Sequence, residues 1–212
     1  MDYPVFKEEM KSSYTILIPD MLPIHFKLII NILKKYGYHV ELLQTSTRAV
    51  VDEGLKNVHN DTCYPALLVI GQFINALKSG KYDVNRTALM LTQTGGGCRA
   101  SNYIHLLRKA LKKEFPQVPV ISLNLSGLEK GSGLSLTLPL LIKVVYAVFY
   151  GDLLMSLYNQ CKPYEIHSGE SESVREKWQE KLTTIFDKRE FIKCKKYCRM
   201  ILEDFDKIER TK

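Results

Sequence analysis

The sequence of 212 residues lacks the motifs that mark several large classes of enzyme. It contains neither of the glycine-rich nucleotide motifs, GxxxxGKS/T and GxGxxG, and no GxSxG turn around a hydrolase nucleophile. Its five histidines do not pair at metal-ligand spacing, and no short CxxC zinc motif is present. The sequence therefore gives no support to a P-loop nucleotide site, a dinucleotide fingerprint, a serine hydrolase or a short-spaced zinc module.

Signals for export and for a membrane span are also lacking. The N-terminus does not have the basic-then-apolar pattern of an export signal. The most apolar run, Leu134–Leu157, contains Pro139, Lys143, Gly151 and Asp152, so we expect no membrane span. Five cysteines, an odd number, in a chain without an export signal indicate reduced thiols and a cytoplasmic setting.

The net charge of +7 raises the question of nucleic-acid binding. Residues 1–161 carry 17 Lys and Arg against 12 Asp and Glu, and residues 162–212 carry 13 against 11. The excess is therefore spread along the chain, and no basic block is interleaved with aromatic residues. We expect no nucleic-acid partner, and a mildly basic surface suits an anionic partner or cofactor.

The first two thirds of the chain alternate between strand-like and helix-like runs. Four short runs rich in β-branched and aliphatic residues predict strands at Tyr14–Ile18, His39–Leu43, Thr87–Thr92 and Val118–Leu123. Apolar residues recur at helical spacing between them, over Ile24–Lys35, Cys63–Leu77 and residues 101–114. The connection 46–59 is polar and weakly helical, and Asp61 or Thr62 is expected to cap the helix that follows. This alternation is typical of a parallel sheet.

The character of the sequence changes after residue 133, where no further strand-like run occurs. We expect a long apolar helix over Leu136–Gln160, broken near Pro139 or Gly151, and amphipathic helices over Glu170–Asp187 and Arg189–Glu209. The predicted fold class is α/β: a small Rossmann-like parallel sheet of about four strands with flanking helices, then a helical C-terminal section. The predicted division is a cysteine-bearing α/β part over residues 1–133 and a helical part over residues 134–212.

A glycine-rich turn separates the third predicted strand from the helix after it. The turn contains Gly95, Gly96 and Gly97, directly followed by Cys98 and Arg99. Consecutive glycines let the backbone approach a ligand closely, and a helix N-terminus beside an arginine favours a thiolate. The turn is a candidate cofactor-binding site with Cys98 as a metal ligand. Two alternatives are an anion bound by its N–H groups and a tight turn without a ligand.

A second cysteine, Cys63, also opens a predicted helix. Ligands of open parallel sheets bind at the carboxyl ends of the strands, so Cys63 and Cys98 are predicted to converge on one metal site there. Taken singly, each cysteine is more often an inert buried residue. A nucleophile–base pair of Cys98 with His105 is a further alternative.

The other cysteines give weaker signals. Cys194 and Cys198 lie four residues apart on a predicted helix and hence on one face, where they are either metal ligands or members of the core face. The flanking aromatic and aliphatic residues favour the core. Cys161 follows the end of a predicted helix and is a candidate third ligand without a supporting motif.

Four segments of the chain together resemble the D-component family of 2-hydroxyacyl-CoA dehydratases: Asn60–Ala66, Thr92–Tyr103, Tyr150–Leu154 and Lys162–Glu165. More closely, they resemble the C-terminal region of the large activase-related proteins of anaerobic bacteria. The resemblance covers about Tyr14 to Ile208 and implies Rossmann-like subdomains whose cysteines hold a four-iron–four-sulfur (4Fe-4S) cluster. Carried over to this chain, it makes Cys63 and Cys98 the candidate cluster ligands.

The resemblance implies low-potential electron transfer or dehydration of acyl-CoA esters, with other dehydratase or activase subunits, or a second copy of the chain, as partners and acyl-CoA as a further candidate ligand. The activase part and a second cysteine-bearing portion of the relatives are not in this sequence, so the cluster is expected to be incomplete or shared with a partner. Two other functions stay open. One is a scaffold or interaction domain without a cluster, and the other is a zinc- or thiol-dependent protein using Cys98.

Overall fold

The computed structural model describes residues 3–59, 61–93, 102–124 and 137–211. The chain forms two compact units. The sheet unit consists of Met1–Met21 and Gly37–Ser135, and the helical unit consists of Leu22–Tyr36 and Leu136–Lys212. The helix predicted at Ile24–Lys35, which the sequence assigned to the α/β part, thus belongs to the helical unit.

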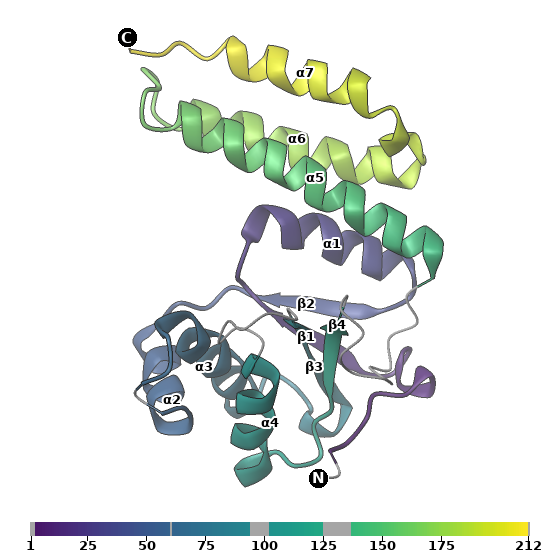
Figure 1. The fold of residues 1–212 in the computed structure, drawn as a ribbon, viewed down its shortest axis with the longest axis vertical. Coiled ribbons are helices and arrows are strands. Elements are labelled where there is room, and N and C mark those ends of the chain that lie inside the picture. The colour runs from purple at the N-terminus through teal and green to yellow at the C-terminus, as the bar shows by residue number, and fades with distance from the viewer. Residues whose placement is uncertain (1–2, 60, 94–101, 125–136, 212) are drawn as a thin grey trace. The chain divides into compact units, whose positions relative to one another are not determined.

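The sheet unit is built on four parallel strands in the order β2-β1-β3-β4 (Figure 1). Their bounds are β1 Thr15–Pro19, β2 His39–Leu43, β3 Thr87–Gln93 and β4 Val120–Asn124. In register, Thr15 of β1 lies opposite both His39 of β2 and Thr87 of β3. The predicted α/β fold with a small Rossmann-like parallel sheet is confirmed.

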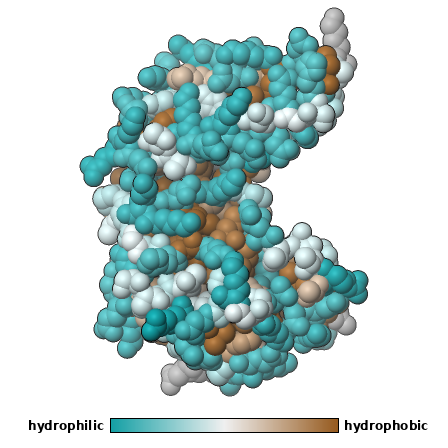
Figure 2. Space-filling view, turned by 180° about the vertical axis from the view of Figure 1, so that it is seen from behind, coloured by the Kyte–Doolittle hydropathy of each residue, from teal (hydrophilic) through white to brown (hydrophobic). Residues whose placement is uncertain are grey.

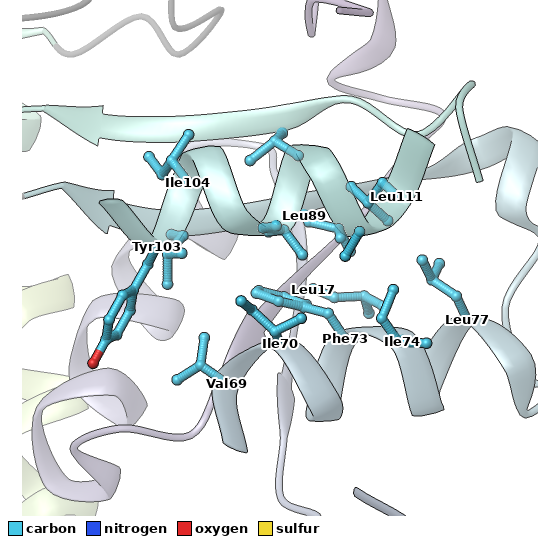
Figure 3. Packing of buried hydrophobic residues seen from close by; sticks show 14 of the residues in the cluster. Leu17, Val69, Ile70, Phe73, Ile74, Leu77, Leu89, Tyr103, Ile104 and Leu111 are labelled. Carbon is cyan, nitrogen blue, oxygen red and sulfur yellow. The ribbon is translucent and has the colours of Figure 1, made fainter. Parts of the chain in front are cut away.

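Two helices, α3 (Tyr64–Lys78) and α4 (Tyr103–Glu114), pack on one face of the sheet (Figure 3). Leu17 of β1 and Leu89 of β3 point into the layer between the sheet and the helices, where Phe73 of α3 is fully buried. Leu, Ile, Val and Phe side chains fill this core, and burial of each contributes roughly 1.5–3 kcal/mol. The core holds the start of α3 and the start of α4 in fixed positions.

A further helix, α2 (Arg48–Asn57), crosses α3 at very short range. A Cβ atom on Gly71 would lie 2.0 Å from the carbonyl oxygen of Val50, and one on Gly54 would lie 2.4 Å from that of Leu67. The two glycines let the helix backbones touch. The sequence predicted only a weakly helical connection here, because the packing against α3 that stabilises α2 is not visible in its polar pattern.

The helical unit contains α1 (Pro23–Lys35), α5 (Leu138–Cys161), α6 (Glu170–Asp187) and α7 (Cys194–Asp206). The expected break in the long helix is wrong: α5 runs without interruption through Pro139 and Gly151. Pro139 lies in the first turn, where its missing N–H removes no helical bond. Gly151 is held inside the helix by packing, as described next.

The contact between α1 and α5 centres on the imidazole of His25, which is buried. Its Nε2 lies 2.9 Å from a carboxylate oxygen of Asp152. A Cβ atom on Gly151 would lie 2.5 Å from the ring, so only glycine leaves room for it. Asn31 of α1 also donates to Thr183 of α6 at 3.2 Å, which ties α1 to a second helix of the unit.

By length and composition, α5 is apolar enough to cross a membrane, and 28% of its most apolar window is buried. Its buried side chains, Leu140, Ala147, Tyr150 and Leu154, lie in a unit where α5 contacts α1, α6 and α7. Other apolar side chains of α5, such as Leu138 and Val145, are exposed. Figure 2 shows a mainly hydrophilic surface with several hydrophobic patches.

Candidate functional site

The carboxyl edge of the parallel sheet is the part of this fold where a ligand is expected. β1 lies between β2 and β3, so the chain winds from β1 in one direction to β2 and in the other direction to β3. The winding therefore reverses at β1, and open α/β sheets in general bind ligands outside the carboxyl ends of the strands at such a reversal. Asp20 follows β1 directly at this edge, and residue 94 follows β3.

Cys63 is the N-cap residue of α3, and its thiol is half-buried. The predicted caps Asp61 and Thr62 lie before the cap position, because Tyr64 and Pro65 already form the first helical turn. The side chain of Cys63 makes no capping hydrogen bond to the helix and instead lies with its Sγ 3.2 Å from the hydroxyl of Tyr103. The positive end of the α3 dipole favours negative charge at this thiol.

Tyr103 connects the two cysteine motifs. It is the first residue of α4, it is buried, and it stands five positions after Cys98 in the sequence. The hydroxyl contact therefore places Cys63 beside the helix start that follows the glycine-rich turn. Cys98 itself lies outside the described residues, as do Gly95, Gly96, Gly97 and Arg99, so their predicted roles stay predictions.

Asp20 is a polar residue of this edge that the sequence prediction did not include in the site. Its backbone N–H donates to the buried side chain of Gln72 in α3 at 3.0 Å. Its Oδ1 is buried, and within the described part of the chain it has no hydrogen-bond partner. Burial raises the pKa of the Asp20 carboxyl above its ordinary value. An acidic residue directly after the first strand was the sequence signal that could have indicated it.

No protein-family model, curated protein or solved structure matches this chain. The functional conclusion therefore depends on the chemistry and the positions of its own residues.

His105 and Cys161 are two further candidate residues with described positions. His105 is exposed on α4. Cys161 is buried at the end of α5 in the helical unit, where a guanidinium nitrogen of Arg210 lies 3.9 Å from its sulfur. Among the residues with described positions, no three His, Cys, Asp or Glu side chains gather as metal ligands. Of the two predicted metal ligands, Cys63 is the one whose position the structure describes.

Two of the four segments that carry the family resemblance have structural roles here. In the segment Tyr150–Leu154, the hydroxyl of Tyr150 donates to the carbonyl of Phe191 at 3.0 Å. Gly151 leaves room for the ring of His25, and Asp152 lies within hydrogen-bond distance of its Nε2. In the segment Lys162–Glu165, the carboxylate of Glu165 accepts from the N–H groups of Gly169, the N-cap residue of α6, and of Ser171 in its first turn.

Proposed function

We propose that the chain is an iron–sulfur-binding component of the type found in 2-hydroxyacyl-CoA dehydratases and activase-related proteins. It would act in low-potential electron transfer or acyl-CoA dehydration, together with a partner that completes the cluster. The observation that carries the proposal is the contact of Cys63 with Tyr103, since it joins one cysteine motif to the helix that follows the other.

Among the residues with described positions, Cys63 has the chemistry and the surroundings of a single cluster ligand. A cysteine thiolate is the usual ligand of an iron–sulfur cluster, and a half-buried thiol at a helix N-terminus limits water access while favouring negative charge. A 4Fe-4S cluster takes about four thiolate or similar ligands. Cys63 and Cys98 would supply two, and a partner subunit or a second copy of the chain would supply the others.

When bound, the cluster would supply one-electron chemistry at low potential. The protein would set that potential through hydrogen bonds to the ligand sulfur and through burial. Tyr103 is placed for this role, because its O–H is within hydrogen-bond distance of Sγ of Cys63. Arg99 would offset the negative charge of the cluster, and the three glycines of the turn would let the backbone approach it.

Anaerobic reconstitution with iron and sulfide tests the proposal. The protein is expected to turn brown, to show the sulfide-to-iron charge-transfer band, and to give an electron paramagnetic resonance signal after reduction. Cys63→Ser and Cys98→Ser should each lower the bound iron several-fold. Cys161→Ser is the matched control, because Cys161 is a buried cysteine of the helical unit and should leave the iron content unchanged.

Tyr103→Phe adds a measurement that a purely structural role would not affect. The variant should keep its iron but show a more negative reduction potential, since a hydrogen bond to the ligand sulfur is lost. A colourless, folded protein without iron after reconstitution would contradict the proposal and favour the scaffold. A colourless protein that retains zinc would favour the zinc- or thiol-dependent alternative.

A further inference from the structure

A second pair of thiols lies in the helical unit, remote in sequence from the motifs discussed above. Cys194 is the first residue of α7, and Cys198 is one turn further along the same face. Their sulfur atoms are 3.5 Å apart, and both side chains are half-buried. The buried residues of α7, Tyr197, Ile201 and Phe205, form the adjoining core face. The expected core role is thus only partly met, because both cysteines stay partly accessible to solvent.

This pair is poorly arranged for a disulfide. Residues four apart on a helix have Cβ atoms about 5–6 Å apart, whereas a disulfide needs about 3.5–4.5 Å. Oxidation would therefore require the first turn of α7 to unwind. An ion inserted between the two sulfurs has no such requirement, because two metal–sulfur bonds span a wider gap than one sulfur–sulfur bond.

We propose that Cys194 and Cys198 form a two-coordinate site for a soft, thiophilic cation, and that the cation is Cu(I). Thiolates select soft ions, and Cu(I) accepts two of them without further ligands. Structural zinc instead needs four ligands in a tetrahedral arrangement. The described residues offer no third His, Cys, Asp or Glu side chain to complete such a set.

Oxygen groups near the two thiols are engaged by other partners, and several neighbouring side chains are basic. The carboxylate of Glu190, just before α7, is held by Lys193 at 2.6 Å and by the hydroxyl of Tyr197 at 2.7 Å. The hydroxyl of Tyr150 donates to the backbone carbonyl of Phe191 at 3.0 Å. The sequence of α7 around the two thiols is rich in Lys and Arg.

The protons, electrons and charge balance when Cu(I) binds. Each thiol releases its proton to water, each sulfur donates one electron pair to Cu(I), and the complex carries one negative charge. The oxidation states of copper and of sulfur do not change. The basic residues of α7 then offset that charge at short range.

A competition titration with a Cu(I) chelator tests the site on the 212-residue chain with Cys63→Ser and Cys98→Ser already introduced. This background removes the thiols of the proposed iron–sulfur site, so failure of one proposal leaves the other intact. One Cu(I) per chain is expected to bind. Cys194→Ser or Cys198→Ser should weaken the apparent affinity at least about a hundredfold, because losing one of two ligands should cost no less than losing an outer-shell partner, which costs about 10–100-fold.

Two controls keep the outcome decisive. Cys161→Ser retains the pair and should leave the affinity unchanged. The double variant Cys198→Ser/Lys196→Cys keeps the number of thiols but puts them on different faces of α7, and it should lose the site while the circular dichroism spectrum stays native. Equal binding in that variant, an equal loss in Cys161→Ser, or a preference for Zn²⁺ over Cu(I) would overturn the proposal.

Discussion

At the scale of single residues, Glu165 shows how one carboxylate can start a helix. Its oxygens accept from the N–H groups of Gly169 at 2.8 Å and Ser171 at 2.9 Å and from the hydroxyl of Ser171, and Lys162 lies 3.0 Å away. These bonds satisfy donors at the start of α6 that have no partner inside the helix. The hydroxyl of Ser171, followed by the two N–H groups, lowers the pKa of Glu165 to about 2.

Glu165→Gln is therefore expected to lower the melting temperature at pH 7, because an amide is a weaker acceptor at a helix N-terminus. A carboxyl group whose pKa is depressed on folding stabilises the protein above its unfolded pKa. That stabilisation is lost as the pH falls from about 4.5 towards about 2. Melting curves of both proteins across this range should converge at the acid end. A constant difference down to pH 2 would contradict the assignment.

Asp20 presents the opposite case, a carboxyl whose pKa is raised by burial. Its charged form disfavours folding at neutral pH, and this penalty disappears as the pH falls through the raised pKa. Asp20→Asn should raise the melting temperature at pH 7 and have little effect at pH 3. Gln72→Ala, which removes the acceptor of the Asp20 N–H, serves as the comparison and should be destabilising at both pH values.

A loss of stability in Asp20→Asn at pH 7 would show that the carboxylate is used in a favourable contact. In that case the site at the carboxyl edge of the sheet would be built around the charge of Asp20, and the reconstitution experiment should be repeated with this variant.

At the scale of elements, α2 and α3 pack through backbone instead of through side chains. Gly71→Ala should destabilise the protein by about 1–3 kcal/mol or more, since the new methyl group meets the carbonyl oxygen of Val50, which cannot move without shifting α2. Asn75→Ala, a half-buried position on the same helix, is the control and should change stability much less. Urea unfolding measures both, and an equally stable Gly71→Ala would mean that α2 can shift freely.

The contact between α1 and α5 allows a more specific test, because the group that a Cβ atom on Gly151 would meet is the side chain of His25, which can be removed by mutation. Gly151→Ala should be destabilising through a clash with the ring of His25. His25→Ala removes that ring, so the double variant should be more stable than the sum of the two single effects predicts. A double-mutant cycle by urea unfolding should give a coupling of at least about 0.5 kcal/mol. Additive effects would show that the two residues do not interact.

At the scale of the whole molecule, the two compact units are interleaved along the chain. α1 lies between β1 and β2 in the sequence, but it packs with α5 and α6 in the helical unit. A fragment of residues 1–135 would therefore carry α1 without the helices that cover its apolar side chains.

Residues 136–212 should not fold cooperatively alone, because they lack Leu22–Tyr36, the segment of the helical unit that contains α1. Mixed or co-expressed, the two fragments should recover a cooperative transition. Circular dichroism melts of each fragment and of the mixture test this expectation. A cooperative transition in residues 136–212 alone would contradict it, because the helical unit would then fold without α1.

Much of the local structure could be predicted from the sequence. The strand positions agreed to within about two residues, and the bounds of α6 were predicted as they occur. Strong hydrophobic periodicity accounts for this success. Three features were not predicted: the regular helix α2, the continuity of α5 and the N-cap at Cys63. Each depends on packing or on the geometry of a first helical turn, and composition does not show these.

The sequence by itself determined the α/β class, the parallel sheet and the identity of the two cysteine motifs, since these follow from short-range pattern and residue chemistry. Only the tertiary structure decided that α1 joins the helical unit, that Gly151 makes room for His25, and that Cys63 meets Tyr103. These are contacts between residues far apart in the chain. No local pattern encodes them, because they depend on which apolar faces pack together once the elements have formed.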